Sequence, residues 1–484
     1  MHRRTRLAAL AAVVVAFTGG AAAAPARAQD GEVVALLQEL VRANTSNPPG
    51  NEALVAAVLR ARLEPLGFQV ELVPTPAPGK VHTIARLPAT APTGEKPLLL
   101  AGHADVVGVE APLWSVDPFG ATIRDGRLFG RGALDFKGGL AAFTVAAMRL
   151  ARSGVPRTRD LILLSEADEE GGAYGTTWLA ENHWDKIDAS ESLNEGGWIF
   201  AGGRGGARLM GITTIDKNSL SVTFRTRGTS THSSRPLRDS ALRRLVRALD
   251  RVERYDAAPR VTPVARTYLR AWARASSGAL ARRLRGITTA RRPAVRRRLA
   301  NRLRDGAWGE LFDGLVRNIF VPTIVAGGFR ANVLPGTAEA TVNMRMLPGQ
   351  KPRPLIRELR RVVDDRRVEI TPIVTGDASV EETLDSFDER AEQAPSSIDT
   401  DLFRSLVAEG RRQWPGVQVT PALFEAGTDA TPWRRRGIPV YGVYPYPITA
   451  GDLRAMHGND ERVPIGALEQ GTDMLTRVVE NAVR

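Results

Sequence analysis

The stretch Leu98-Leu99-Leu100-Ala101-Gly102-His103-Ala104-Asp105 gives the clearest indication of the fold class. Four apolar residues follow one another without the alternation of a half-exposed strand, which is typical of a strand buried on both faces. The apolar run ends at Gly102-His103, where polar side chains begin. In sheets built from such strands, ligands bind beyond the carboxyl ends of the strands, so this polar end is a candidate site.

Three further segments repeat the pattern of an apolar run that ends in polar residues. Residues 161–164 lead into 165–170, residues 438–443 lead towards 456–458, and the more mixed 187–193 leads into 194–197. Helical patterns lie between these runs, the most regular at 138–152. Strands that alternate with helices predict an α/β catalytic domain, with a mostly parallel sheet covered by helices on both faces.

The sequence changes character between residues 215 and 371. Residues 219–227 and 338–346 alternate like half-exposed strands, and 240–254 and 354–365 have helical periodicity. We therefore expect a small inserted α+β domain, of the ferredoxin-like kind, that carries an Arg-rich helical insertion. The predicted boundaries are 1–28 for a signal peptide, 29–214 and 372–484 for the two parts of the catalytic domain, and 215–371 for the inserted domain.

The first residues have the order of a secretory signal peptide. Arg3, Arg4 and Arg6 precede an apolar run over 7–17, and small residues follow as far as Ala26-Arg27-Ala28. The apolar run is shorter than the roughly 20 residues that a spanning helix needs. We expect a secreted or periplasmic protein with no membrane association after cleavage; an uncleaved membrane anchor is the alternative.

The titratable residues near the predicted strand ends point to a metal site. The chain has no cysteine, so metal ligands must come from His, Asp and Glu. Asp135, Glu169, Glu170 and Glu195 each follow a predicted strand or a glycine-rich turn, and His103 and His457 lie in comparable positions. Carboxylates that converge in a cleft repel each other, and divalent cations such as zinc relieve that repulsion. The set is large enough for two metals that share a carboxylate.

The formal net charge of +13 does not by itself indicate a nucleic-acid-binding protein. Much of the excess lies between 260 and 304, where arginines are spaced as on the solvated faces of helices. They are Arg282, Arg283, Arg285, Arg291, Arg292, Arg296, Arg297, Arg298, Arg302 and Arg304. Because no nucleic-acid motif or interleaved aromatic residues accompany them, we expect no nucleic-acid partner. A surface that binds acidic lipid or another polyanion remains an alternative.

Five short motifs occur in one order along the chain. They are Gly102-His103-Ala104-Asp105-Val106-Val107, Gly130-Arg131-Gly132-Ala133-Leu134-Asp135-Phe136-Lys137-Gly138-Gly139, Asp168-Glu169-Glu170-Gly171-Gly172, Asn194-Glu195-Gly196-Gly197 and Met456-His457-Gly458. Together they resemble the aminoacylase and carboxypeptidase family of dinuclear zinc metallopeptidases. The resemblance spans nearly the whole mature chain, and the carboxypeptidase S branch with its secreted N-acyl-amino-acid hydrolases is the most similar. It implies a zinc-dependent hydrolase that cleaves the amide bond of N-acyl amino acids or short peptides.

The resemblance also implies a role for each residue. Asp135 would bridge two Zn²⁺ ions, for which Co²⁺ or Mn²⁺ are alternatives. His103 and Glu195 would complete the protein ligands of one metal, and Glu170 and His457 those of the other. Asp105 would orient the ring of His103. Glu169 would be the general base that takes a proton from a metal-bridging water and passes it to the leaving amine.

The inserted domain carries a second group of motif residues. Thr231-His232-Ser233-Ser234 is similar to a Gly-His-Ser-Ser turn of the family, with Thr231 in place of glycine. The resemblance implies that His232 stabilises the oxyanion in a neighbouring active site, which requires a homodimer or a closing lid. In the motifs Asn332-Val333-Leu334-Pro335 and Asn343-Met344-Arg345, Asn332 and Arg345 are candidates for binding a substrate carboxylate or the oxyanion.

One departure from the family pattern concerns the substrate. Gly427-Thr428-Asp429-Ala430 is often followed in the family by an arginine that binds the substrate carboxylate, but Thr431 follows here. Arg434 or Arg345 would then take over. Two other classes of protein remain open: a non-catalytic peptide-binding protein of the same fold, against which Glu169 argues, and a polyanion-binding surface protein that uses the Arg-rich segment. Hydrolysis and condensation are equally compatible with the motifs.

Overall fold

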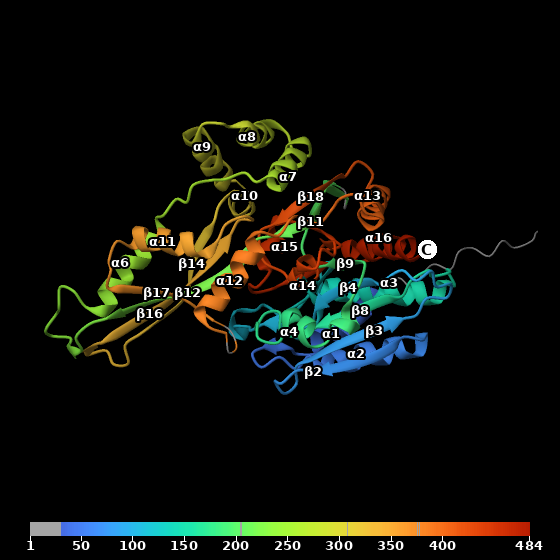
Figure 1. Cartoon of the computed structure of the whole chain (residues 1–484), viewed down its shortest axis with the longest axis horizontal. Coiled ribbons are helices and arrows are strands. Elements are labelled where there is room, and N and C mark those ends of the chain that lie inside the picture. Colours follow the sequence, from blue (N-terminus) through green and yellow to red (C-terminus); the bar gives the residue numbers. More distant parts are fainter. Residues whose placement is uncertain (1–30, 204–205, 307, 375, 377) are drawn as a thin grey trace, which may run out of the picture.

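The computed structural model describes residues 31–484, apart from 204–205, 307, 375 and 377. The predicted signal peptide, residues 1–28, lies outside the described residues. The chain forms a large body with an arm that projects from it (Figure 1). Within the described part of the chain, no helix combines the length and the apolar character needed to cross a membrane.

The body is built on a sheet of ten strands. Its four middle strands are β8 (Leu161–Glu166), β4 (Leu98–His103), β9 (Glu191–Asn194) and β19 (Val440–Gly442), each parallel to its neighbour. The outer strands are β2 (Gln69–Pro74), β3 (Val81–Leu87), β11 (Ala207–Asp216), β10 (Ile199–Ala201), β18 (Gln418–Phe424) and β20 (Pro447–Ile448). Antiparallel pairs occur on both sides of the parallel centre, so the sheet is mixed. The predicted α/β class is confirmed.

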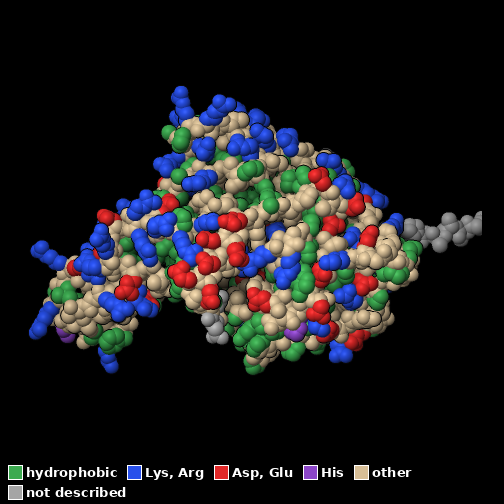
Figure 2. Space-filling model, in the orientation of Figure 1, with side chains coloured by type: hydrophobic (Ala, Val, Ile, Leu, Met, Phe, Trp, Pro, Cys, Tyr) green, Lys and Arg blue, Asp and Glu red, His purple; other side chains and the backbone are tan. Residues whose placement is uncertain are grey.

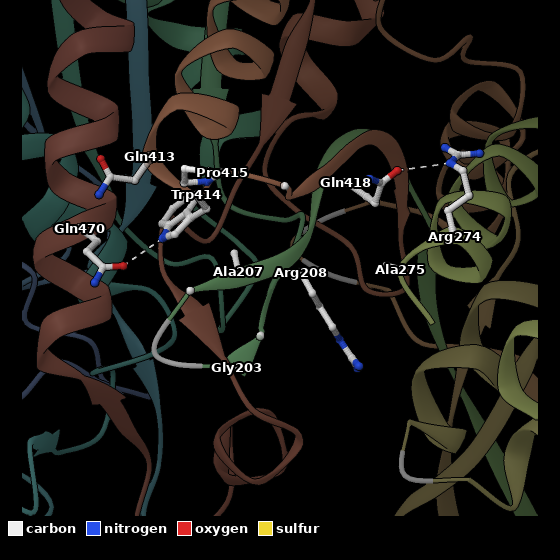
Figure 3. A pocket seen from close by; sticks show the side chains of 13 residues that line it. Gly203, Ala207, Arg208, Arg274, Ala275, Gln413, Trp414, Pro415, Gln418 and Gln470 are labelled. Carbon is white, nitrogen blue, oxygen red and sulfur yellow. Dashed lines mark hydrogen bonds between the residues drawn. The ribbon is translucent and has the colours of Figure 1, made fainter. Parts of the chain in front are cut away.

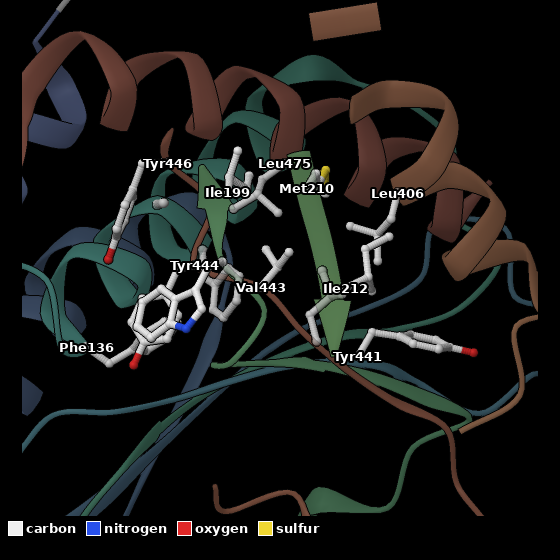
Figure 4. Close-up of a cluster of buried hydrophobic side chains, with 14 of the residues drawn as sticks. Phe136, Ile199, Met210, Ile212, Leu406, Tyr441, Val443, Tyr444, Tyr446 and Leu475 are labelled. Atoms are coloured by element: carbon white, nitrogen blue, oxygen red, sulfur yellow. The ribbon is translucent and has the colours of Figure 1, made fainter. Parts of the chain in front are cut away.

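Helices cover both faces of this sheet. Leu98 and Leu100 pack into one core cluster, whereas Leu99 and Ala101 pack into another, as expected for a strand buried on both sides. The first face is covered by α1 (Glu32–Arg42), α3 (Lys137–Ser153), α13 (Asp401–Gln413) and α16 (Ile465–Val483), and the second by α4 (Thr176–Asn182), α5 (Trp184–Ile187) and α14 (Thr431–Arg435). Within the larger core, the ring of Tyr444 lies next to the rings of Phe136 and Tyr446 (Figure 4).

The arm contains a second sheet of four antiparallel strands. Their order is β14 (Ile319–Gly327), β16 (Thr337–Met346), β12 (Asn218–Arg227) and β17 (Val368–Pro372). The helices α6 (Ala241–Glu253) and α11 (Pro352–Val363) pack together beside this sheet. Strands and helices follow the βαββαβ order of a ferredoxin-like unit, and the arm has its own core around Val222, Phe224 and Val342.

The Arg-rich segment forms four helices between α6 and β14, which we call the insertion. They are α7 (Pro263–Arg274), α8 (Gly278–Thr289), α9 (Pro293–Arg304) and α10 (Gly309–Val316). Although the insertion lies within the sequence of the arm, it packs on the body, because Tyr268 and Trp272 of α7 are buried in the body's core. Its arginines are exposed or half-buried, as predicted for solvated helix faces, and basic side chains gather over the insertion in Figure 2.

Two buried cations join the insertion, the arm and the body. Lys217, between β11 and β12, donates through Nζ to the carbonyl oxygens of Gly314 (3.0 Å) and Arg317 (2.7 Å). Arg317 follows α10 and donates through Nε to the carbonyl of Ala257, which lies between α6 and α7 (2.9 Å). Three of the chain segments that pass between body and arm are therefore hydrogen-bonded to one another.

Candidate metal centre and active site

The predicted metal ligands come together at one edge of the body's sheet. His103 is the last residue of β4, Glu170 lies four residues after β8, and Glu195 directly follows β9. Asp135 lies two residues before α3, and His457 follows the short helix α15 (Ala450–Ala455). The carboxyl ends of neighbouring parallel strands meet at this edge, which explains why segments so far apart in sequence converge.

Asp135 lies between two sets of donor atoms. Its Oδ1 is 3.3 Å from Nε2 of His103, which is also 3.5 Å from Oε2 of Glu195. Its Oδ2 is 3.0 Å from Nε2 of His457, which is 2.9 Å from Oε1 of Glu170. Each oxygen of Asp135 thus faces a different His–Glu pair. The five residues form the two groups implied by the sequence motifs, with the shared carboxylate in the middle.

The electrostatics of this cluster fit divalent cations. Burial alone would lower the pKa of His457, but Asp135 and Glu170 raise it to about 11; in the same way Asp105, Asp135 and Glu195 raise the pKa of His103. Burial raises the pKa of Glu195 to about 7. Donor atoms of His103, Asp135 and Glu170 all lie within 4.8 Å of one another. Protons held here on imidazole and carboxyl groups are replaced when a cation binds, and the donor set suits zinc or a related metal.

Asp105 supports the cluster in two ways. Its backbone carbonyl accepts a hydrogen bond from Nδ1 of His103 (2.9 Å), which leaves Nε2 of the ring free as a ligand. Its carboxylate lies farther from the ring, at 3.6 Å, and instead accepts the backbone N–H groups of Glu169 (3.1 Å) and Glu170 (3.0 Å). The amide of Asn47 also donates to this carboxylate (2.7 Å). Asp105 therefore holds the Glu169–Glu170 turn as well as the imidazole.

Glu169 lies beside the ligands but belongs to neither donor pair. Its side chain lines a cleft of about 710 Å³ between the body and the arm, together with Glu170 and Arg345. Burial and the nearby carboxylates of Glu195 and Glu170 raise the pKa of Glu169 well above its usual value. A carboxyl group in this position can hold and release a proton beside the metal ligands.

Sequence reasoning missed two residues that support Asp135. The hydroxyl of Tyr444 donates to Oδ1 of Asp135 (2.7 Å) and lies 3.1 Å from Oε2 of Glu195. Oε1 of Glu461 accepts the backbone N–H groups of Leu134 (2.8 Å) and Asp135 (3.0 Å). Tyr444 follows an apolar run that predicts only a buried strand. Glu461 directly follows Asp460 and lies four residues after His457, a proximity that could have marked it although the motif ends at Gly458.

The arginines of the cleft differ in whether they are already paired. Arg434 forms an ion pair with Asp216, with Nη1 and Oδ2 2.5 Å apart, so its guanidinium already has a partner within the protein. Arg345, on β16, interacts electrostatically with Glu169 and Glu170. Arg390 on α12 (Val380–Ala391) lines the same cleft, and its guanidinium lies 5.1 Å from the centroid of the Phe387 ring. Asp429 attracts this side chain and Arg435 repels it, but among the described residues its side chain has no hydrogen bond or ion pair. No motif in the sequence marks Arg390.

His232 and Asn332 lie together, away from the cleft. His232 ends β13 (Thr231–His232), which pairs with β15 (Val333–Leu334), and the backbone N–H of Ser233 donates to the carbonyl of Asn332 (2.9 Å). Both side chains are exposed, and neither lines the cleft. Within this single chain, the structure does not bring either residue to the metal ligands.

A second hollow, of about 560 Å³, lies between the body and the end of α7 of the insertion and has different chemistry (Figure 3). Arg208 and Arg274 line it; Arg208 lies over the ring of Trp272 at 5.0 Å, and Arg274 donates to Gln418 at 3.3 Å. No carboxylate or histidine is among the lining residues that the structure describes. We therefore assign the reaction to the cleft and not to this hollow.

Two histidines and three carboxylates at the strand ends of an α/β body, with a further carboxylate beside them, define a metal-dependent hydrolase. Comparison with known proteins agrees: the chain belongs to peptidase family M20/M25/M40, whose model matches residues 99–481. It is therefore an enzyme that hydrolyses amide bonds with the help of metal.

Several curated relatives resemble the chain over most of its length. A probable carboxypeptidase S-like protein 2 of Dictyostelium discoideum is 27% identical over 80% of this chain and 72% of its own. The human N-fatty-acyl-amino acid synthase/hydrolase PM20D1 is 25% identical, covering 80% and 74%. A succinyl-diaminopimelate desuccinylase of Parvibaculum lavamentivorans is 28% identical, covering 91% and 93%.

Solved structures share the fold. The M20 metallo-carboxypeptidase Sso-CP2 of Sulfolobus solfataricus aligns with a TM-score of 0.66 at 18% identity, covering 93% of this chain and 98% of its own. Human carnosine dipeptidase 1 aligns with a TM-score of 0.63 at 18% identity, covering 94% and 97%. At these identities the likeness supports the arrangement of body and arm.

Proposed function

We propose that the chain is a zinc-dependent hydrolase of N-acyl amino acids or short peptides, which cleaves the amide bond next to a free carboxylate. The observation that carries the proposal is the position of Asp135 between two His–Glu pairs, with Glu169 next to them. The names of two relatives, a probable carboxypeptidase S-like protein and an N-fatty-acyl-amino acid synthase/hydrolase, support this substrate class.

His103, Asp135 and Glu195 would hold one zinc ion, and Asp135, Glu170 and His457 the other. Bound zinc supplies Lewis acidity and lowers the pKa of water from about 16 to about 7. Tyr444 and Glu461 keep Asp135 in place, and the carbonyl of Asp105 fixes the tautomer of His103.

In the reaction, Glu169 takes a proton from the attacking water, whose oxygen forms a bond to the amide carbon. The same carboxyl group then passes this proton to the leaving nitrogen as the C–N bond breaks, so an acid and a free amine result. Arg345 and Arg390 line the cleft and would bind the substrate carboxylate, which a guanidinium can hold through two hydrogen bonds. They would take over from the arginine that Thr431 replaces.

The test is hydrolysis of a panel of N-acyl amino acids and dipeptides by the purified protein, with zinc and with chelator. We expect turnover that chelator abolishes and zinc restores. Glu169→Gln should lower kcat by at least about a hundredfold, with the metal content unchanged. The control Glu110→Gln removes an exposed carboxylate outside the cleft and should keep full activity.

Two results would contradict the proposal. Purified protein without zinc, cobalt or manganese and without chelator-sensitive turnover would remove the metal chemistry. Tight peptide binding without turnover in the wild type would support the non-catalytic alternative.

We also propose that the protein is exported and cleaved after Ala28. N-terminal sequencing of protein recovered from the medium or periplasm should find residue 29 first. A full-length chain retained in the cell would contradict export.

A further inference from the structure

The hollow of about 560 Å³ beside the end of α7 contains a guanidinium group without a counter-charge. Arg208, on β11, lines this hollow, and its Nε is buried without a hydrogen-bond partner among the described residues. Burial lowers the pKa of Arg208, and no described carboxylate opposes this shift through its charge. The guanidinium lies over the ring of Trp272, which supports the side chain but does not neutralise it.

The two most deeply buried arginines in the described part of the chain, Arg131 and Arg317, both have a carboxylate partner. Arg131 forms an ion pair with Glu461 at 2.6 Å, and Arg317 forms one with Asp313. Taking a guanidinium out of water costs free energy, which an opposite charge or hydrogen bonds must offset. Arg208 is half-buried and has no such partner inside the protein, so an anion from solution can supply it.

Other polar side chains of the hollow also present hydrogen-bond donors. Oε1 of Gln470 accepts the indole N–H of Trp414 (2.9 Å), and Oε1 of Gln418 accepts the Nε–H of Arg274 (3.3 Å). Because these glutamine oxygens are used within the protein, the NH2 groups remain available for a ligand. In Figure 3, Arg208 lies between the Gln470–Trp414 pair and the Gln418–Arg274 pair. Donors thus flank Arg208, and no described lining residue carries a carboxylate.

The hollow borders a strongly basic part of the chain. Between residues 257 and 304 the sequence contains fourteen arginines and no Asp, Glu or Lys. Arg274 of the hollow belongs to this stretch, and basic side chains gather over the insertion in Figure 2. Charges of one sign raise the local concentration of ions of the opposite sign. The field of the insertion therefore favours an anion in the hollow.

We propose that the hollow is a binding site for a tetrahedral oxyanion, a phosphate or sulfate group, held by Arg208, Arg274 and the amide groups of Gln418 and Gln470. These donors come from β11, α7, β18 and α16, and their several directions suit an anion with three or four oxygens better than a planar carboxylate. The bound anion links the body to the insertion. The hollow shares no lining residue with the metal-bearing cleft, so this inference does not depend on the proposed function.

The experiment is calorimetric titration of the purified full chain with sodium sulfate, sodium phosphate and glycerol 3-phosphate, compared with sodium acetate and sodium chloride at equal ionic strength. We expect saturable binding of the tetrahedral anions and a melting temperature that rises with their concentration. Tighter binding of glycerol 3-phosphate than of phosphate would identify an ester as the ligand, and the reverse order the free ion. Equal responses to all five salts would overturn the proposal.

A pair of matched variants assigns the binding to the hollow. Arg208→Met removes the unpaired guanidinium but keeps a long side chain against Trp272, and the Kd for sulfate should rise at least about tenfold. The control Arg270→Met removes the same charge from an exposed site on α7 outside the hollow and should keep the wild-type Kd. An equal loss in both variants would trace the effect to the general charge of the insertion and overturn the proposal.

Gln418→Glu gives the hollow a counter-charge of its own. The new carboxylate still accepts from Arg274, so sulfate binding should be lost while the melting temperature without sulfate stays equal or rises. This variant separates loss of the site from loss of the fold, and it decides if Arg208→Met does not fold. If Gln418→Glu binds sulfate as the wild type does, the anion binds elsewhere and the proposal fails.

Discussion

At the scale of single residues, Asp135 depends on hydrogen bonds that are not metal bonds. Tyr444 donates to its Oδ1, and Glu461 accepts its backbone N–H. Outer partners of this kind fix the direction of a ligand's lone pairs. We therefore expect the affinity for metal to respond to residues that never touch it.

Tyr444→Phe should weaken metal binding by about 10- to 100-fold, because Asp135 loses its buried donor. Competition with a chromogenic chelator measures the affinity. Tyr441→Phe is the matched control: Tyr441 is equally buried and loses a hydrogen bond to Ser397, but lies outside the cluster. Equal affinities for both variants would show that Tyr444 does not support the ligand.

His82 gives the fold a pH-dependent stability. It is fully buried, its Nε2–H donates to the carbonyl of Tyr174 (2.8 Å), and its Nδ1 accepts the N–H of Ala167 (3.1 Å), so the ring is neutral. Burial lowers its pKa from 6.5 to about 4. Between pH 6.5 and about pH 4, His82 is protonated in the unfolded chain but neutral in the folded chain. The free energy of unfolding therefore falls as the pH falls through this window.

The expected loss between pH 6.5 and pH 4 is about 3 kcal/mol from this residue. Urea unfolding at several pH values measures it, and the wild type is compared with His82→Gln, which has no titratable ring. The variant should lose less stability over the window. Parallel pH profiles of the two proteins would contradict the assignment.

The residue types at the site were predictable only where a motif marks them. His103, Asp135, Glu170, Glu195 and His457 lie in short motifs at strand ends, and the structure brings them together. Tyr444 and Arg390 reach the site through tertiary packing, which leaves no regular spacing in the sequence, whereas Glu461 lies only four residues after His457.

At the scale of elements, periodicity predicted the buried strands and the regular helices. The expected strand at 98–101 is β4, and the expected helix at 138–152 is α3 with one more residue at each end. The helix expected over 354–365 begins earlier, at Pro352, because proline is favoured in the first turn, and ends before Asp364, whose φ is +46°. β11 and β18 were missed, because polar and small residues interrupt their apolar runs.

Of the two glycines in the helix α16, one packs tightly against a neighbouring backbone and the other has open space around it. A Cβ at Gly471 would lie 1.3 Å from the carbonyl oxygen of Pro445, whereas a Cβ at Gly466 would meet nothing within 4 Å. Gly471→Ala should destabilise the fold by about 3 kcal/mol, since backbone must move. Gly466→Ala should leave stability unchanged or slightly raised. Denaturant unfolding compares them, and equal midpoints would contradict the close packing of α16 against Pro445.

At the scale of the whole molecule, the sequence predicted two units but not how the insertion sits. Its helices interrupt the arm in sequence, and amphipathic periodicity shows that each has an apolar face without showing what covers that face. The structure gives the answer through Tyr268 and Trp272, which are buried in the body. Which part of the protein covers the apolar face of a helix depends on the three-dimensional fold and does not follow from the periodicity of that helix.

The edge of the arm predicts a dimer. β14 is an edge strand with exposed apolar side chains, among them Ile324 (61%) and Val325 (60%), and such edges pair with another chain unless covered. We expect a homodimer in sedimentation experiments, and Val325→Lys should make it monomeric. If His232 acts on the partner's site, Val325→Lys and His232→Ala should both lose activity. A monomeric wild type with full activity would contradict this.

Lys217 and Arg317 tie together three of the chain segments that pass between body and arm. An inserted domain is ordinarily tethered by two segments and rotates about them as a simple hinge. Here the chain leaves the arm after α6, forms the insertion on the body, and re-enters the arm at β14. A rotation of the arm must therefore pull on the end of α10. Opening and closing of the arm would thus strain the contact between the insertion and the body, and the connections between body and arm cannot act as a free joint.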